Sequence, residues 1–163
     1  MADLKWLRES GLEALIQRLV KEEQVPLIGI CGGYQMLGER LSDPEGVEGE
    51  PGSSMRGMEL LAAETIFAAE KTRTQTEGTL QELPGIYAAC AGQTVKGYEI
   101  HMGETFRTEI ETGTGNSDIS HENEEISPAV RLADGRMDGF VRADGLVFGS
   151  YLHGIFDNLE FTG

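Results

Sequence analysis

The first clear pattern along the chain is a helical repeat of apolar positions. Five apolar residues recur at intervals of three and four: Leu12, Leu15, Ile16, Leu19 and Val20. This spacing places them on one face of an α-helix. A capping box from Ser10 to Glu13 predicts where the helix begins, and an earlier turn or short helix is expected over residues 3–9.

A short apolar run follows and is interrupted by glycine. Residues 25–30 (VPLIGI) predict a buried strand, because a short apolar run bounded by Pro and Gly is typical of strands. Cys31-Gly32-Gly33 comes next, and residues 34–41 return to a helical pattern. The order helix, buried strand, tight turn and helix predicts an α/β domain with a mostly parallel sheet and helices on both faces.

The rest of the chain alternates strand patterns with polar connections. Strand patterns recur at 60–67, 72–80, 94–101, 104–110, 138–142 and 146–152. The last two are joined by a turn at Asp144-Gly145. Residues 42–57 are rich in Gly, Pro, Ser and acidic side chains and predict a surface loop. Residues 111–128 have few large apolar side chains, so we expect a mobile loop there.

Composition limits the classes of protein and partner. With 163 residues, the chain has the length of one domain. Its net charge of −15 argues against nucleic acid and anionic membranes as partners, because contacts with phosphate require an excess of Lys and Arg. No apolar stretch approaches the ~20 residues of a membrane-spanning helix, and residues 1–20 lack a signal-peptide pattern. We therefore expect a cytoplasmic protein.

The two cysteines differ in their local sequence. Cys31 and Cys90 lack CxxC spacing, so we expect neither a disulfide framework nor a metal site. Cys90 is not followed by a strand-to-helix turn, and we interpret it as structural. Cys31 lies between a predicted strand and a predicted helix, with Gly29 two residues before it and Gly33 two residues after it.

The glycines around Cys31 predict a nucleophile on a sharp turn. A side chain on a strand-to-helix turn is exposed at the carboxyl end of a parallel sheet, where α/β proteins carry their sites. Larger neighbours would collide there, and Gly29 and Gly33 avoid this. The backbone N–H of Gly32 would face the oxyanion, and the helix N-terminus would favour the thiolate. The alternative is that Cys31 is a small buried residue.

A cysteine nucleophile requires a base, and the chain has three histidines. His153 follows an apolar strand pattern and precedes a glycine, which places it at the end of a strand. His101 also ends a strand pattern and is a competitor. His121 lies in the polar segment and is interpreted as solvated. The sequence favours Cys31 as nucleophile and His153 as base.

Three stretches resemble a known family. They are residues 29–38 (GICGGYQMLG), 97–103 (GYEIHMG) and 149–158 (GSYLHGIFDN). The first resembles the nucleophile elbow of class I (triad) glutamine amidotransferases. The three together, in this order, resemble the glutaminase domain of the cobyric acid synthase family.

The resemblance implies a flavodoxin-like domain of a cobalamin-biosynthesis enzyme. Glutamine would supply ammonia, and ATP would activate side-chain carboxylates of adenosylcobyrinic acid a,c-diamide for amidation. Cys31 matches the family's nucleophile and His153 its base, while Gly33 and Gln35 match elbow positions that hold the substrate. No cofactor is expected in this domain; ATP, magnesium and the corrinoid are expected in a separate synthetase domain.

Two departures from the wider superfamily stand out. Its acidic residue two positions after the histidine is replaced here by Phe156, as in cobyric acid synthases. Glu99 and Asp157 are then candidates to orient His153, and the role of His101 in its motif is open. From the resemblance, we also expect the chain to begin after the family's first strands and to be without the amino-terminal synthetase domain. We therefore expect a fragment with little glutaminase activity alone.

Other functions remain open. Within the amidotransferases, the alternatives are cobyrinic acid a,c-diamide synthase or another ligase-linked glutaminase. From other classes, a cysteine hydrolase or redox-responsive domain of similar fold would also carry an elbow cysteine. A non-catalytic interaction module is the third class.

Overall fold

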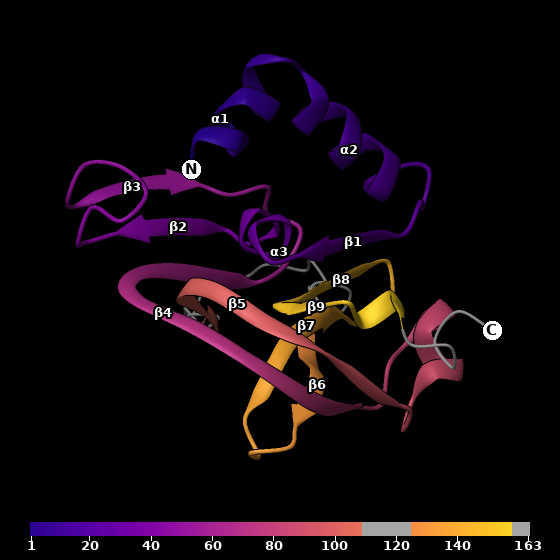
Figure 1. The fold of residues 1–163 in the computed structure, drawn as a ribbon. Helices are drawn as coiled ribbons and strands as arrows, with labels where there is room; N and C mark the ends of the chain where they lie inside the picture. The colour runs from indigo at the N-terminus through magenta and orange to yellow at the C-terminus, as the bar shows by residue number, and fades with distance from the viewer. Residues whose placement is uncertain (109–124, 158–163) are drawn as a thin grey trace, which may run out of the picture.

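The computed structural model describes residues 1–108 and 125–157 of the chain (Figure 1). Its elements, in order, are α1 (Ala2–Glu9), α2 (Leu12–Lys21), β1 (Leu27–Ile30), α3 (Gly32–Leu37), β2 (Arg40–Asp43), β3 (Ser53–Arg56), β4 (Ala63–Leu80), η1 (Gly85–Cys90), β5 (Thr94–Arg107), β6 (Ile126–Leu132), β7 (Met137–Arg142), β8 (Val147–Ser150), β9 (Leu152–His153) and η3 (Ile155–Asp157). The predicted helices near the start, the first strand and the hairpin around Asp144-Gly145 are confirmed.

The sheet is mixed rather than mostly parallel. Its strands run in the order β1-β8-β7-β6-β4-β2-β3, and β5 pairs with both β4 and β9. Within the described residues, the pairs β1–β8 and β2–β4 are parallel, and the other pairs are antiparallel. The prediction of a mostly parallel sheet was wrong, because short connections at 133–136 and 143–146 cannot carry the crossover that parallel neighbours need.

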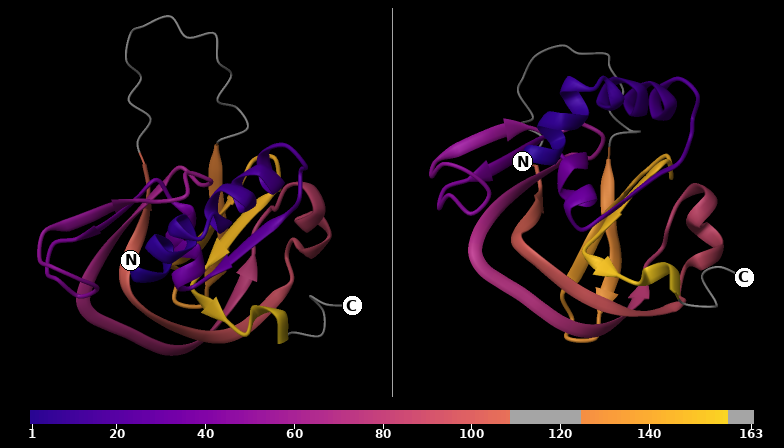
Figure 2. Two further views of the ribbon diagram at one scale, coloured as in Figure 1. Left: turned by 90° about the horizontal axis from the view of Figure 1, so that it is seen from above. Right: turned by 45° about the horizontal axis from the view of Figure 1, so that its top comes forward.

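The longer helices share one side of the molecule. In Figure 1, α1 and α2 lie together above β1 and β2, so helices on both faces, as predicted, are not what the described residues show. Figure 2 shows β4 and β5 as a long curved ribbon that wraps around the other strands. None of the described helices combines the length and apolar composition needed to cross a bilayer.

The core has two parts. Beneath the helices it contains Leu4, Val20, Tyr34 and Leu41, all buried. Between η1 and the strands it contains a second cluster that includes Leu80, Tyr87, Val95, Phe148 and Ile155. Cys90 packs half-buried against this second cluster, in agreement with its structural interpretation.

The start of α2 differs from the predicted capping box. Ser10 continues the backbone of α1, and its hydroxyl donates to the Leu7 carbonyl at 3.0 Å. Gly11 precedes α2 with a left-handed backbone (φ 79°), which provides the sharp turn between the helices. Glu13 is buried and accepts a hydrogen bond from Arg8 Nη2 at 2.7 Å instead of capping.

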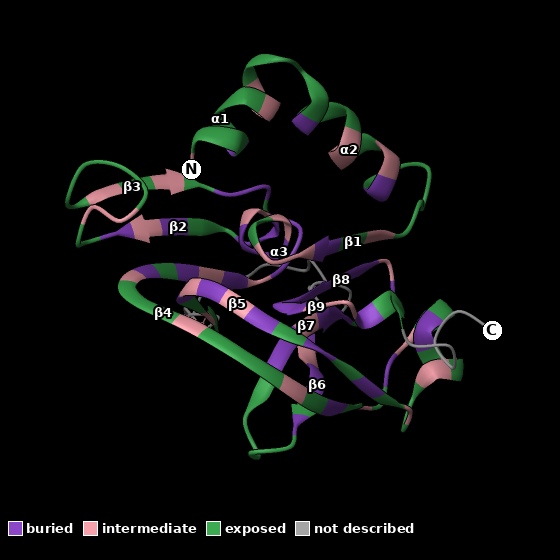
Figure 3. Ribbon diagram, viewed as in Figure 1, coloured by how far each residue is buried: buried purple, intermediate pink, exposed green. Residues whose placement is uncertain are grey.

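Several predicted boundaries also change. The strand patterns at 60–67 and 72–80 are halves of β4, and those at 94–101 and 104–110 belong to β5, because a register shift between Ile66 and Lys71 interrupts their periodicity without ending the pairing. Figure 3 shows buried and exposed residues alternating along β5. The helix predicted to reach Leu41 ends at Leu37, and the predicted loop at 42–57 contains β3.

The predicted loop at 111–128 is only partly described. Residues 109–124, with His121, lie outside the described residues. Ile126 begins β6, so the loop prediction was wrong for its last residues. The loop was predicted from the polar composition of the residues before Ile126. This composition does not indicate where the apolar pattern of β6 begins.

We expect α1 to be anchored mainly through Leu4. This side chain is 0% exposed, whereas Trp6 on the same helix is 60% exposed. Leu4→Ala should lower the free energy of unfolding by about 2–5 kcal/mol, because it leaves a cavity in the core. Urea unfolding followed by circular dichroism measures this, with Trp6→Ala as the control. Equal effects of the two substitutions would contradict this packing role.

Candidate active site

Cys31 occupies a strained turn between β1 and α3. Its backbone angles are φ 54° and ψ −115°, a conformation that side-chain-bearing residues rarely adopt. Such a conformation costs about 1–3 kcal/mol and is concentrated at functional sites. The turn is held by the parallel β1–β8 pair and by the backbone N–H of Cys31, which donates to the Ser150 carbonyl at 2.9 Å. The predicted strand-turn-helix geometry is therefore present.

Only one of the two flanking glycines is required by close packing. A Cβ at Gly29 would lie 2.7 Å from Leu37 Cδ1 and 2.8 Å from the Tyr34 backbone nitrogen. A Cβ at Gly33 would meet nothing within 4 Å, and the same holds for Gly32. The predicted collision at position 33 was therefore wrong. Gly32 and Gly33 instead leave open space over the first turn of α3.

The Cys31 side chain is held as a thiol. Its Sγ–H donates to the Ile100 carbonyl at 3.3 Å. Burial raises the pKa of the Cys31 thiol, and the backbone N–H of Gly32 acts in the opposite direction. We expected the N-terminus of the helix to favour the thiolate. The effect of burial is larger, because removal from water disfavours the charged form. Attack by Cys31 would require a base.

A cavity of about 290 Å³ opens beside Cys31. Its lining includes Gln35 from α3, Ile100 and His101 from β5, and Lys71 from β4. Asp3 and Glu48 contribute acidic side chains to the same lining. The cavity therefore combines the predicted nucleophile with charges of both signs. No group of three or more His, Cys, Asp or Glu side chains within residues 1–108 and 125–157 is placed to hold a metal ion.

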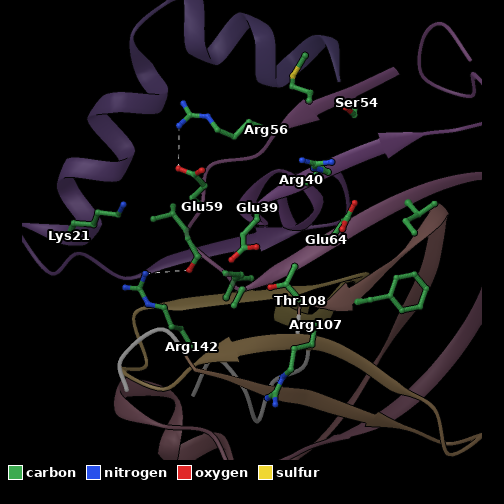
Figure 4. A pocket seen from close by; sticks show the side chains of 16 residues that line it. Lys21, Glu39, Arg40, Ser54, Arg56, Glu59, Glu64, Arg107, Thr108 and Arg142 are labelled. Atoms are coloured by element: carbon green, nitrogen blue, oxygen red, sulfur yellow. Dashed lines mark hydrogen bonds and ion pairs between the residues drawn. The ribbon is translucent and has the colours of Figure 1, made fainter. Parts of the chain in front are cut away.

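A larger cleft of about 1250 Å³ lies elsewhere (Figure 4). It is bordered by α2, by β2 and β3, and by parts of β4 and β5, and its lining includes Arg40, Arg107 and Arg142. Arg56 pairs with Glu59 at 3.2 Å across it. Its described lining contains no cysteine or histidine, so this cleft lacks the nucleophile and the base that acyl transfer requires.

His153 lies beside the strand that contacts Cys31. β9 pairs antiparallel with β5, with His153 opposite Tyr98, two positions from Ile100. A Cβ at Gly97 would lie 2.1 Å from the His153 carbonyl oxygen, so this approach requires glycine at position 97. The Nε2 atom of His153 is buried and has no hydrogen-bond partner in the described part of the chain. His153 is not among the described residues lining the 290 Å³ cavity.

Both ring nitrogens of His101 are engaged. Nδ1 faces the Gly103 carbonyl at 2.8 Å, and Nε2 faces Glu99 Oε1 at 3.0 Å. The ring also stacks on Tyr151, with centroids 3.7 Å apart and planes 17° from parallel. A base needs an unoccupied ring nitrogen, which His101 lacks and His153 has. The assignment of His153 as base stays a prediction, and His101 is the weaker alternative.

Neither predicted orienting carboxylate contacts His153 among the described interactions. Glu99 is 3% exposed and accepts from Arg136 at 2.9 and 2.8 Å as well as from His101. These hydrogen bonds lower the pKa of Glu99 to about 2, and the one with His101 has the largest effect. Asp157 is exposed in η3, and its backbone N–H donates to the Gly154 carbonyl.

Gln35 is buried, and its amide hydrogens are used within the protein. Its Nε2 donates to the Met102 carbonyl at 3.1 Å and to the Tyr151 hydroxyl at 3.2 Å. The Tyr151 hydroxyl also bonds Thr105 Oγ1 at 2.6 Å. A substrate contact by Gln35, which remains a prediction, would therefore have to use its amide oxygen.

Sequence reasoning missed three residues of this network: Arg136, Asp138 and Tyr151. Asp138 is buried and accepts hydrogen bonds from the Ser150 hydroxyl and the Tyr151 backbone N–H. Burial raises the pKa of Asp138. A carboxylate within an apolar strand pattern is the signal that could have identified Asp138. No local signal marked Arg136, because its partner Glu99 is distant in sequence.

The comparisons with known proteins agree on one family. A model described as CobB/CobQ-like glutamine amidotransferase domain matches residues 1–161. Cobyric acid synthases from Ruminiclostridium cellulolyticum and Salmonella typhimurium are each 46% identical, over 98% and 99% of this chain. The chain spans 29% of the length of each of these relatives.

A solved structure has the same fold. It is described as "Crystal structure of glutamine amidotransferase", and it matches with a TM-score of 0.53 and 16% sequence identity. The match covers 97% of this chain and 67% of that one. This likeness confirms the predicted α/β amidotransferase fold, with the correction that the sheet is mixed.

The Glu99 carboxylate predicts a pH-dependent stability. Its pKa is about 2 in the folded protein and 4.5 ordinarily. A carboxylate whose pKa falls on folding stabilises the folded state above its unfolded pKa and loses this contribution as the pH falls toward its folded pKa. Between about pH 5 and about pH 2, wild type should lose up to about 3 kcal/mol more free energy of unfolding than Glu99→Gln.

Urea unfolding at a series of pH values measures this difference. Glu104→Gln, an exposed position on the same strand, is the control and should keep the wild-type pH dependence. A Glu99→Gln curve parallel to that of wild type over this range would show that the paired carboxylate does not contribute.

Proposed function

Because the chain belongs to the CobB/CobQ-like glutamine amidotransferase family, we propose that it hydrolyses the side-chain amide of glutamine, with Cys31 as nucleophile and His153 as base. The observation that carries this proposal is the Cys31 turn. A cysteine at positive φ, between a strand and a helix and beside a cavity, is arranged to expose its sulfur to a substrate. The unoccupied Nε2 of His153, on a strand next to β5, supports the role of base.

The proposed reaction begins with proton transfer. The Cys31 thiol leaves the Ile100 carbonyl and gives its proton to Nε2 of His153, and the thiolate attacks the amide carbon. The backbone N–H of Gly32 stabilises the oxyanion of the tetrahedral intermediate. His153 returns the proton to the departing ammonia, which leaves a glutamyl thioester. Water then hydrolyses the thioester to glutamate and restores the thiol.

The charges of the cavity match a zwitterionic amino acid. Lys71 provides a cation for the α-carboxylate of glutamine, and Asp3 and Glu48 provide anions for its α-ammonium group. The register shift in β4 that ends at Lys71 changes the direction of the strand beside the cavity. We propose that Lys71 is the carboxylate ligand.

We further propose that the ammonia serves a cobyric acid synthase reaction. The support is the name of the relatives, at 46% identity over nearly all of this chain. In that reaction, ammonia would react with ATP-activated carboxylates of adenosylcobyrinic acid a,c-diamide. ATP, magnesium and the corrinoid would bind to a synthetase domain outside these residues, and no cofactor is assigned to this one. Two free cysteines are consistent with a cytoplasmic location.

Cys31→Ala should affect amidation from glutamine but not amidation from free ammonia. In a full-length synthase containing these residues, the substitution should reduce glutamine-dependent amidation at least about 10³-fold. Amidation from free ammonia should persist, because that reaction bypasses the thioester. Cys90→Ala is the matched control and should retain both activities. Loss of both activities in Cys31→Ala would refute the assigned role, and labelling of this chain by a diazoketone analogue of glutamine tests the site directly.

Lys71→Met should weaken glutamine binding more than it slows the chemistry. Loss of a charged hydrogen bond of about 1.5–3 kcal/mol predicts a roughly 10- to 100-fold increase in KM with little change in kcat. Glutaminase kinetics of the same full-length protein measure this. Arg73→Met, an exposed cation on the same strand, should leave KM unchanged. An unchanged KM for Lys71→Met would exclude it as a ligand.

A further inference from the structure

A buried charge cluster on β5 has no part in the proposed reaction. It consists of Glu99, His101 and the guanidinium of Arg136. Glu99 and His101 are buried, at 3% and 8% exposed, and Arg136 reaches Glu99 from the β6–β7 connection. Arg136 itself is 52% exposed, but the buried Glu99 and His101 would be costly to bury unpaired, so their pairing distinguishes the cluster from a surface ion pair.

The hydrogen bonds of His101 define its protonation. Glu99 is held ionised between Arg136 and His101, so it only accepts, and Nε2 of His101 must carry a hydrogen. The Gly103 carbonyl also only accepts, so Nδ1 must carry a hydrogen. A ring that donates from both nitrogens is an imidazolium. Arg136 also pairs with Asp134 at 2.8 Å, so the connected groups are two cations and two carboxylates, and His101 is the cation among them that lines the cavity.

The imidazolium of His101 lines the cavity that contains Cys31. The residue before His101 provides the carbonyl that accepts the Cys31 thiol. The residue after it, Met102, provides the carbonyl that accepts Gln35 Nε2. The His101 ring stacks on Tyr151, whose hydroxyl also meets Gln35. The ring therefore supports β5 where this strand contacts the elbow.

We propose that His101 is a positioning residue, held as an imidazolium by Glu99 and the Gly103 carbonyl, that fixes the β5 carbonyls against the elbow and favours the Cys31 thiolate by its charge. The inference rests on the proposed function only in taking Cys31 as the nucleophile. His101 touches no reacting atom in this scheme, because both of its nitrogens are engaged within the protein.

Other charged groups surround these two residues. Facing the cluster or the cavity are Asp134 beside Arg136, Asp138 on β7, Lys71 on β4, Asp3 on α1, Glu48 after β2 and the phenol of Tyr151. His153 lies on β9, which pairs with β5. Lys71 adds to the positive charge near Cys31, while Asp3 and Glu48 oppose it. A nearby cation favours the ionised form of an acid. We therefore expect His101 to lower the pKa of the Cys31 thiol, against the opposite effects of burial, Asp3 and Glu48.

The pH dependence of Cys31 alkylation tests the proposal in this chain. Rates of reaction with iodoacetamide are measured against pH in a Cys90→Ala background, so that only Cys31 reacts. His101→Gln keeps a hydrogen-bond donor but removes the charge, and the midpoint of the profile should move to higher pH. Arg73→Gln is the control: it removes an exposed cation opposite Ile100 and should leave the midpoint in place.

The outcomes are distinct. A folded His101→Gln protein with a wild-type midpoint overturns the proposal, and so does an equal shift in Arg73→Gln. If His101→Gln does not fold, ¹⁵N nuclear magnetic resonance of the wild-type ring decides: two protonated nitrogens at neutral pH support the proposal, and one bare nitrogen overturns it. Failure of the glutamine analogue to label Cys31, together with a shifted midpoint, would refute the proposed function and not this role of His101.

Discussion

Cys31 holds a backbone conformation that is unfavourable for a residue with a side chain, and its neighbours compensate for that cost. The parallel pairing of β1 with β8 fixes the chain before the turn, and the Cys31 N–H is bound by Ser150. Gly29 allows α3 to pack directly on β1, and Gly149 on β8 receives the ring of Tyr34 from that helix. The position of the sulfur is therefore set by the packing of a strand and a helix rather than by a loop.

β5 connects every part of the candidate site. Its backbone carbonyls meet the Cys31 thiol and the Gln35 amide, its side chains form the charged cluster, and its other edge pairs with β9. The same strand pairs along the long β4 ribbon and contributes Val95 to the second core cluster. A disturbance of β5 would therefore affect the predicted nucleophile, the predicted base and the cavity beside Cys31 together.

The sequence predicted the features that depend on local conformation. Glycine spacing around Cys31 indicated the turn, and the apolar strand before His153 indicated a side chain at a strand end. Pairing direction was predicted wrongly, because periodicity of two shows which residues share a face but not which strands are neighbours. The predicted capping box at Ser10 was wrong, because the buried Glu13 carboxylate forms an ion pair with Arg8 instead. The partners of Glu99 and Gln35 come from distant strands, which local patterns cannot identify.

The contact between Gly97 and the His153 carbonyl has an evolutionary consequence. Any side chain at position 97 would occupy the space of that carbonyl, so the glycine and the location of the histidine backbone depend on each other. β9 is only two residues long, and among the described strands it pairs with β5. In related chains, a larger residue at this position would thus require the backbone at the histidine to move away from β5, even where both histidine and cysteine are retained.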